Sequence, residues 1–138
     1  MKKQFFRIAA AAALFTAAVL FLPRLTRQPE QTDYIVLADD AAREAWLNLR
    51  GWQVSAPEIT EIRLPQNWQT EQGQSWLRLQ AAQGLHPEQF AGQNAVRCLY
   101  PVPDAQRQHL YAELLLCGDI LVGAQVYDAA SGLMQSVR

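Results

Sequence analysis

Apolar and polar positions change their spacing along the chain, and this spacing predicts the secondary structure. Residues 8–22 form an almost unbroken apolar run, as in a helix that enters or crosses a membrane. After residue 38 the apolar positions recur at helical spacing or alternate as in strands. The expected elements are helices over 39–50 and 68–83, a single helical turn over 86–90, and strands over 59–64, 96–102, 110–116 and 120–126.

Capping residues mark the ends of the two expected helices. Asp39 or Asp40 is expected to cap the first helix, and Gly51 follows its end. The inward face of this helix is predicted to hold Ala42, Ala45, Trp46 and Leu49. The second helix is expected to be capped by Asn67 and to end before Gly84. Its many glutamines indicate a solvated outer face.

The order of these elements, α-β-α-β-β-β, indicates an α+β fold. It predicts an antiparallel sheet of about four strands with the helices packed on one face. Residues 26–38 contain Pro29 and several polar residues with little periodicity and read as a linker, although 34–37 could also form a short strand or a packing segment. The chain is therefore predicted to consist of an N-terminal membrane anchor (1–25), this linker and an α+β domain (39–138).

The N-terminal apolar run has two interpretations. As a helix, Phe5 to Leu25 would extend about 31 Å, enough to cross a hydrocarbon core of about 30 Å. Basic residues are more numerous before the run than after it, which favours a cytoplasmic N-terminus. A cleaved signal peptide needs small residues after the run, whereas Leu22-Pro23-Arg24-Leu25 stands there. The anchor is favoured, and both interpretations, anchored or secreted, place the domain outside the cytoplasm.

Charge is distributed unevenly along the chain. The formal net charge is −1, but the part after residue 27 holds all 13 acidic residues and seven arginines, a net charge of −6. An acidic domain repels the phosphate backbone of nucleic acids. Nucleic acid is therefore excluded as an expected partner, and the remaining basic residues flank the predicted anchor.

Several short segments of the domain match a known pattern in the same order. They are Trp46-Leu47, Gly51–Val54, Glu61–Pro65, Leu79-Gln80, Gln83–Leu85, Phe90–Gly92, Ala112–Leu116, Val122–Ala124 and Ala130–Met134. Over about residues 41–136 they resemble an uncharacterised bacterial family, domain of unknown function 4830. The resemblance implies an N-terminal membrane segment, and it implies no activity or site residue because that family has none assigned. Gly118-Asp119 departs from the more usual Asp-Gly order, which puts the local turn type in doubt.

Cys98 and Cys117 are the only cysteines. Outside the cytoplasm such a pair can oxidise. The expected strand register, however, places Cys98 opposite Glu113 or Leu114, so Cys117 lies about three residues, roughly 10 Å, too far along the strand. Two free thiols, one buried and one in a loop, are therefore favoured over a disulfide, and no CxxC spacing suggests redox catalysis.

No residue pattern predicts catalysis, a metal site or a cofactor. His86 and His109 are isolated and lack the spacing of metal-binding histidines. The acids Glu58, Glu61, Asp119 and Asp128 are interpreted as surface residues of an acidic domain and not as an acid–base pair. The alternative from the enzyme class is an envelope hydrolase whose site combines such acids with His109.

The four tryptophans carry the remaining functional expectation. Trp46 and Trp76 are interpreted as core residues. Trp52 and Trp68 lie at element ends, where a partly exposed indole can contact an envelope protein or a cell-wall component, although packing within the domain is the commoner role. The expected function is a non-enzymatic binding or sensing module at the bacterial cell envelope. An accessory subunit, whose anchor pairs with another membrane protein through Ala9–Ala13, is a further alternative.

Overall fold

The computed structural model describes residues 33–104, 106 and 109–138. Tyr34–Arg138 forms a compact unit. The predicted membrane anchor and residues 26–32 of the predicted linker lie outside the described residues. Within the described ranges, no helix has the length and apolar character needed to cross a membrane.

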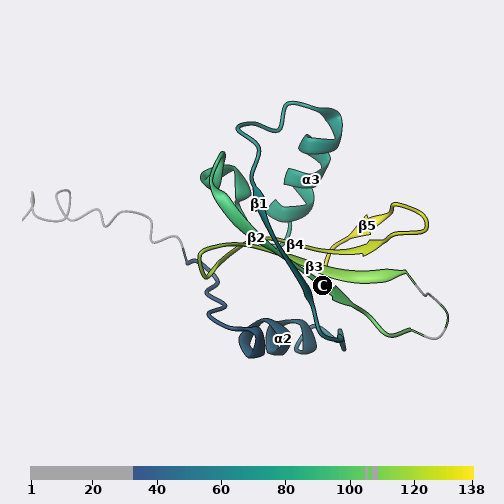
Figure 1. Ribbon diagram of the computed structural model, residues 1–138. Coiled ribbons are helices and arrows are strands. Elements are labelled where there is room, and N and C mark those ends of the chain that lie inside the picture. The colour runs from purple at the N-terminus through teal and green to yellow at the C-terminus, as the bar shows by residue number, and fades with distance from the viewer. Residues whose placement is uncertain (1–32, 105, 107–108) are drawn as a thin grey trace, which may run out of the picture. The chain divides into compact units, whose positions relative to one another are not determined.

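The described domain combines helices with one antiparallel sheet, which confirms the predicted α+β class (Figure 1). The strands are arranged in the order β1-β2-β3-β4-β5. The sheet therefore has five strands and not about four, because β5 is a two-residue strand that leaves no periodic signal. The elements are α2 (Asp40–Asn48), β1 (Glu58–Arg63), α3 (Glu71–Ala81), the 3-10 helix η1 (Pro87–Phe90), β2 (Asn94–Pro101), β3 (Leu110–Cys117), β4 (Ile120–Asp128) and β5 (Met134–Gln135).

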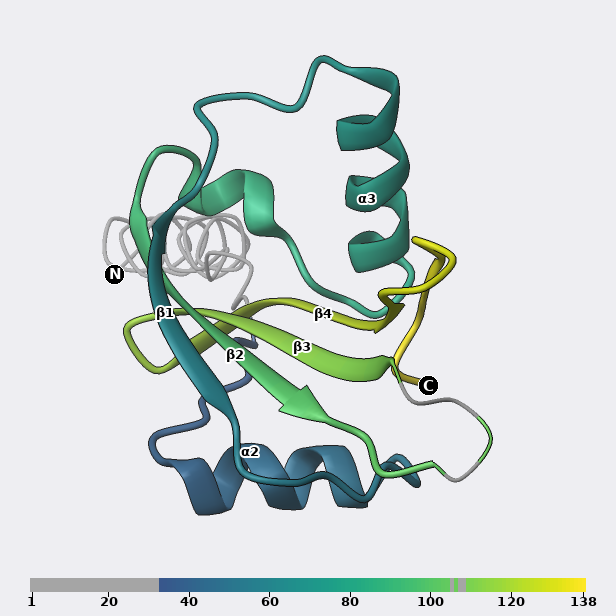
Figure 2. The same ribbon diagram turned by 45° about the vertical axis from the view of Figure 1, so that its right-hand side comes forward.

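The helices α2 and α3 lie on opposite faces of the sheet (Figure 2). On the α2 face, Leu47 belongs to a core cluster with Cys98 and Leu114. On the α3 face, Leu115 and Val122 form a second cluster, against which Trp68 and Trp76 pack. The prediction that both helices pack on one face is therefore wrong. Because both faces are covered, almost every position of β3 and β4 is buried, including those expected to face solvent.

The helix boundaries agree with the capping signals only in part. Asp39 caps α2 by accepting a hydrogen bond from Ala42 N at 2.8 Å, as predicted. The helix α3 is capped by Thr70, which accepts from Gly73 N at 3.0 Å, so the prediction of a cap at Asn67 is wrong. Thr70 itself is extended, and Trp68 lies alongside the first turn of the helix, close to Gly73.

The inward face of α2 also differs from the prediction. Leu47 is fully buried, whereas Leu49 is 86 % exposed. Arg43 lies one helical turn before Leu47 and donates a hydrogen bond to Cys98 Sγ at 3.3 Å. The helix therefore turns Arg43 and Leu47 toward the sheet. The prediction used only apolar residues to find the inward face, so it missed Arg43 and wrongly included Leu49.

The segment before α2 belongs to the domain. Val36 forms an isolated antiparallel bridge with Ile120. Around it, Leu37 N donates to Asp119 O at 2.8 Å and Leu121 N donates to Ile35 O at 2.9 Å. These contacts cover one end of β4, so the domain begins at Tyr34, before residue 39, where the sequence placed the boundary.

Candidate functional site

A groove of about 820 Å³ runs between α3 and the loop that joins β4 to β5. Its aromatic wall consists of Trp68 and Trp76, whose indole rings stack with centroids 6.0 Å apart and planes 21° apart. Met134, which is half exposed, and Gly132 line the opposite side. Of the two tryptophans singled out from the sequence, Trp68 thus lines an open groove.

Two glycines allow the tryptophans to adopt these positions. A Cβ at Gly73 would lie 3.1 Å from Trp68 Cβ, so a larger residue in the first turn of α3 would push this indole away. A Cβ at Gly123 would lie 2.9 Å from Trp76 Cζ2. Since Gly123 is in β4, Trp76 can lie directly on the sheet. Trp76 is therefore held between a helix and a strand, and Trp68, in the segment before α3, lies against the first turn of that helix.

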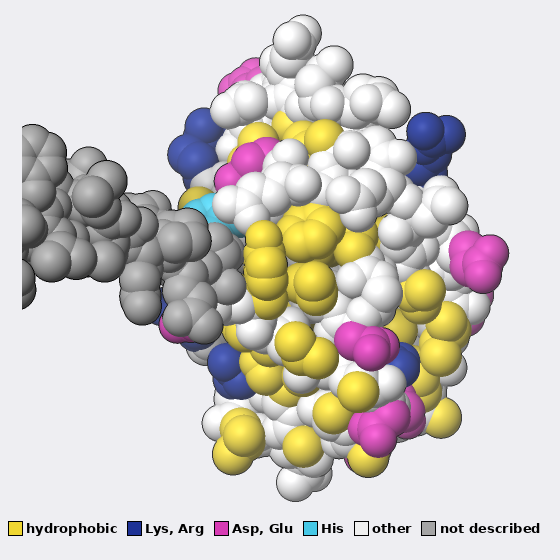
Figure 3. All heavy atoms as spheres, turned by 90° about the vertical axis from the view of Figure 1, so that its left-hand side faces the viewer, with side chains coloured by type: hydrophobic (Ala, Val, Ile, Leu, Met, Phe, Trp, Pro, Cys, Tyr) yellow, Lys and Arg dark blue, Asp and Glu magenta, His cyan; other side chains and the backbone are white. Residues whose placement is uncertain are grey.

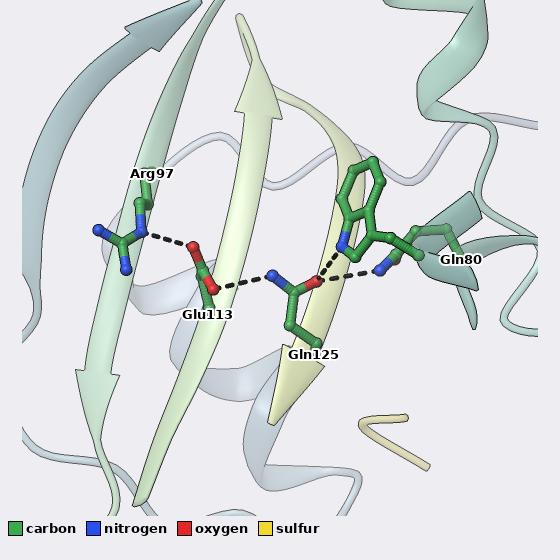
Figure 4. A network of polar contacts seen from close by, with 5 residues as sticks. Gln80, Arg97, Glu113 and Gln125 are labelled. Atoms are coloured by element: carbon green, nitrogen blue, oxygen red, sulfur yellow. Dashed lines mark hydrogen bonds and ion pairs between the residues drawn. The ribbon is translucent and has the colours of Figure 1, made fainter. Parts of the chain in front are cut away.

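Trp76 is also fixed by a buried network of polar side chains beneath the groove (Figure 4). Its indole Nε1 donates to Gln125 Oε1 at 3.1 Å, and Gln80 Nε2 donates to the same oxygen at 3.0 Å. Gln125 Nε2 donates to Glu113 Oε2 at 2.8 Å. The other carboxylate oxygen of Glu113 accepts from Arg97 Nε, which links the network to β2.

The Glu113 carboxylate, which can only accept, and the Trp76 indole N–H, which can only donate, set the direction of the hydrogen bonds between them. A carboxylate only accepts, so Gln125 must turn its amide nitrogen toward Glu113 and its oxygen toward Trp76. Gln80 then presents its nitrogen to Gln125 and its oxygen to Ala124 N, at 2.8 Å. The side-chain amides of Gln80 and Gln125 therefore each have one orientation that satisfies all their hydrogen-bond partners. The position of Trp76 is therefore determined before any ligand arrives.

Gln80 and its neighbour Gln83 also cover the outer edge of β4. Gln83 Nε2 donates to Ala124 O at 2.8 Å, and Gln83 Oε1 accepts from Val137 N at 3.0 Å. Gln83 is half-buried and Gln80 is fully buried. The expectation that the glutamines of this helix form a solvated outer face is therefore wrong at Gln80.

The charge of the groove limits what it can bind. Among the described residues that line it, Glu71 is the only charged one. Gln72 and Ser75 add neutral hydrogen-bonding groups at the helix side of the rim. No described basic side chain lines the groove itself, although Arg78 donates to Ser75 Oγ at 3.0 Å at its rim. The carboxylate and the indole faces of the lining favour a neutral or cationic group.

Trp52, the other tryptophan singled out from the sequence, lies apart from this groove. Its indole Nε1 donates to Val137 O at 2.7 Å, and its ring packs against the core on the α2 face. The structure therefore does not bring Trp52 and Trp68 together. Trp52 holds the C-terminal residues against the domain, which is the packing role considered for it.

The cysteines lie on opposite faces of the sheet as free thiols. Cys98 is opposite Leu114, within the predicted register, and Cys117 ends β3. Both side chains are buried, so the expectation that one of them lies in a loop is wrong. Burial raises the pKa of both thiols, which disfavours the reactive thiolate form.

Cys98 belongs to a small polar cluster beneath α2. Tyr100 donates its hydroxyl to Asp40 Oδ1 at 2.6 Å, and Arg43 lies beside both Cys98 and Tyr100. Burial, followed by the bond to Asp40, raises the pKa of Tyr100. Cys98 and Tyr100 are almost fully buried, so this cluster ties α2 to β2 and offers no accessible reactive group.

The histidines and acids considered for an enzyme do not form one cluster among the described residues. His109 lies beside Asp128, because Ala129 N donates to His109 O at 2.8 Å and Leu110 pairs with Asp128. Glu58 and Glu61 lie in β1, and Asp119 lies in the turn before β4. His86 contacts Glu88 at 3.3 Å on the surface, and His109 is exposed. In the part of the chain that the structure describes, Glu113 is the buried carboxylate, and its partners are Arg97 and Gln125. No group of three or more potential metal ligands occurs among the described residues.

A second apolar surface lies away from the groove. Hydrophobic side chains gather in the centre of the face shown in Figure 3. At the start of the domain, Tyr34 and Val36 are 47 % and 61 % exposed, and Tyr34 packs edge-on against Phe90 with ring centroids 5.8 Å apart. The groove between α3 and the β4–β5 loop differs from these surfaces because stacked aromatic side chains form its wall.

Sequence reasoning did not find the polar network under the groove. With both helices predicted on one face of the sheet, the strand alternation puts Glu113 and Gln125 on the opposite face, which would be open to solvent, where polar residues need no explanation. The sequence does contain a sign of this network, because Glu113 and Gln125 each interrupt a strand that is otherwise mostly apolar. A polar residue in such a strand indicates a buried hydrogen-bonded partner.

Comparison of the chain with protein-family models, with curated proteins and with solved structures gave no match. The likeness to domain of unknown function 4830 therefore stays a prediction from the sequence.

Proposed function

We propose that this protein is a membrane-anchored, non-enzymatic binding or sensing module that presents its α+β domain outside the cytoplasm at the bacterial cell envelope. The observation that supports binding is the groove walled by Trp68 and Trp76. The proposed placement rests on the apolar run over residues 8–22 and its basic flanks. The proposed binding role and the proposed placement thus rest on two separate parts of the chain.

The groove has the features that favour binding of a partner. Its aromatic wall supplies large apolar area with a polar indole N–H, and the flexible side chain of Met134 on the other side can adapt to a ligand. Gln72 and Ser75 offer hydrogen bonds that can orient a bound group. Because Trp76 is already held by Gln125, little ordering is needed on binding, which favours affinity.

The partner class follows from the charge of the site. Glu71 is the only charged lining residue among those described, and the domain as a whole is acidic. A segment of an envelope protein that carries an apolar side chain beside a neutral or basic one would fit the groove. A neutral cell-wall glycan stacked on the indoles is the other class of ligand with this chemistry.

Photocrosslinking in intact cells tests the binding site. A photoreactive amino acid is placed at Gln72, which lines the groove, and at Ala81, which is exposed on the same helix but does not line it. We expect one recurring envelope adduct at Gln72, none at Ala81, and loss of the adduct on Trp68→Ala. Mass spectrometry of the adduct identifies a protein partner or a glycan.

Two other results would change the conclusion. Adducts that form equally at both positions, or that persist in Trp68→Ala, would remove the groove as the binding site. An adduct that disappears only when the N-terminal segment is replaced by an unrelated membrane helix would instead support the accessory-subunit alternative, in which the Ala9–Ala13 face makes the contact.

A further inference from the structure

The main-chain groups along one edge of the sheet are hydrogen-bonded within the domain, whereas those along the other edge pair with no described strand. Outside β4, Val36 pairs with Ile120 near one end, and β5 pairs near the other. Between them, the main-chain N–H and C=O of Ala124 are bound by Gln80 and Gln83. Along the described part of the chain, no strand pairs with the outer side of β1. The fold therefore closes one edge and leaves the other open.

The open edge of β1 presents its main-chain groups in a fixed alternation. Leu64 N donates to Gln93 O at 2.9 Å, so Leu64 directs its main chain toward β2. In an antiparallel pair, residues that bond to the neighbour alternate with residues that face away. Ile59, Glu61 and Arg63 therefore direct their N–H and C=O groups outward. These residues can bond to one more strand.

Neither helix covers this edge (Figures 1 and 2). The helix α3 packs toward β4, where Trp76 lies on Gly123. The helix α2 contacts β2 through Arg43 and Cys98. On β1 itself, Ile59 is 56 % exposed. A strand added beside β1 would thus meet a free main-chain edge and exposed side chains.

We propose that the outer side of β1 pairs in antiparallel fashion with β1 of a second copy of this chain. A two-fold axis perpendicular to the sheet places one residue opposite its own copy. An axis at Glu61 would bring two like charges together, and an axis at Thr60 would place glutamates opposite isoleucines. An axis at Ile62 places Glu61 opposite Arg63 of the second copy, twice by symmetry, and Ile62 opposite Ile62.

This register agrees with the direction of the main-chain groups. Glu61 and Arg63 both face outward, so each of the two symmetric pairs exchanges its N–H···O=C bonds. Arg63 donates its Nε to Gly92 O at 2.9 Å on the β2 side, so the proposed contact with Glu61 of the second copy is made through its Nη groups. The self-complementary charge pattern of the strand thus points to a second copy as the occupant. This inference goes beyond the proposed function and does not depend on the groove.

Single cysteines along β1 test the register in the full-length protein. Ile62→Cys places its two copies opposite each other at a Cα spacing of about 4.5 Å, within the range of a disulfide. Thr60→Cys is the matched control, because its two copies would lie about 13 Å apart along the strands. Mild oxidation is expected to give covalent dimers with Ile62→Cys and none with Thr60→Cys. No dimer with Ile62→Cys, or equal yields from both variants, overturns the proposal.

Charge reversal tests the same pairing without cysteines. Glu61→Arg and Arg63→Glu each place like charges opposite one another in both symmetric pairs, so each is expected to weaken dimerisation about tenfold. In an equal mixture of the two variants, opposite charges face each other again and heterodimers should form. Sedimentation equilibrium measures each variant alone and the mixture. A monomeric wild-type protein, self-association unchanged by charge reversal, or a mixture that does not recover association contradicts the proposed pairing.

Discussion

The side-chain oxygen of Gln80 accepts a hydrogen bond from the main-chain nitrogen of Ala124 at 2.8 Å. Gln83 completes this contact by donating to Ala124 O, also at 2.8 Å. A pair of helix side chains therefore takes the place of a neighbouring strand in the middle of β4. Because unpaired strand edges promote aggregation, this contact protects the domain as well as stabilising it.

Replacing Gln80 by leucine is expected to lower the free energy of unfolding by about 1–3 kcal/mol. The substitution leaves the buried Ala124 N–H without its acceptor and removes one donor from Gln125 Oε1. Chemical denaturation measures the change. Gln72→Leu, at an exposed position of the same helix, is the control and should change the stability by less than about 0.5 kcal/mol. Equal effects of the two substitutions would contradict the role assigned to Gln80.

Gly123→Ala should displace Trp76 from the sheet. The added Cβ would lie 2.9 Å from Trp76 Cζ2, and overpacking of this kind destabilises proteins by about 1–3 kcal/mol. The smaller ring in Trp76→Phe relieves the contact, so the same alanine should cost less in that background. A double-mutant cycle by denaturant unfolding measures the difference. Additive effects would show that the two residues do not press on each other.

Stability is expected to fall in the alkaline range. Burial raises the pKa of Cys98 and of Tyr100 above their ordinary values of 9.0 and 10.0. Below these values both the folded and the unfolded chain keep the proton, and the contribution to stability is complete. Above them the unfolded chain loses the proton first, so the free energy of unfolding falls by about 1.4 kcal/mol per pH unit for each group.

Two tyrosine variants test the origin of this slope. Tyr100→Phe should reduce the fall in stability above pH 10, because the group that titrates in the unfolded chain is then absent. Tyr34→Phe, at an exposed position, is the control for the loss of a tyrosine hydroxyl. Denaturation curves between pH 8 and 11 give the measurement. A slope that is unchanged in Tyr100→Phe would rule out this residue as its cause.

The thiols are expected to react only when the protein unfolds. Cys98 and Cys117 are buried on opposite faces of the sheet, so neither a reagent nor the other thiol can reach them. An aromatic disulfide reagent should detect no fast-reacting thiol in the native protein and both thiols in denaturant without a reductant. Fewer than two reactive thiols after unfolding would indicate a disulfide. That result would contradict the placement of the two cysteines on opposite faces of the sheet.

The proposed placement outside the cytoplasm can be tested by labelling. Ser55 is exposed, and the native cysteines are buried, so Ser55→Cys supplies one reactive thiol on the domain. A membrane-impermeant maleimide should label it in intact cells. Lys3→Cys, before the predicted anchor, is the control and should be labelled only after the membrane is permeabilised. The reverse pattern would place the domain in the cytoplasm.

Periodicity and capping predicted most of the elements, because these signals depend on neighbouring residues. Asp39, one of the two residues considered as the cap of the first helix, and the order of the predicted helices and strands were confirmed. The two-residue strand β5 was missed, since it is formed by pairing with Val126 and Tyr127 and not by a pattern of its own. Thr70 was missed because the preceding Asn67 is an equally good capping residue.

The arrangement of the layers depends on contacts that a single sequence does not display. Apolar residues on both sides of β3 and β4 were consistent with a sheet covered on both faces, yet the alternation was taken to give one inward face. That choice also assigned Glu113 and Gln125 to solvent. Trp68 was singled out because of its position at a helix end, but its stacking on Trp76 depends on Gly73 and Gly123, whose role becomes visible only in three dimensions.

Val137 joins the two sides of the sheet through its own main chain. Its nitrogen donates to Gln83, which extends from the α3 side, and its oxygen accepts from Trp52, which packs on the α2 side. Its side chain is fully buried. Unfolding on either face of the sheet therefore removes one of the two hydrogen bonds that hold Val137, and this weakens the contact that Val137 makes on the other face. The domain is expected to lose both helices in one cooperative transition, with the same midpoint for tryptophan fluorescence and for helical circular dichroism.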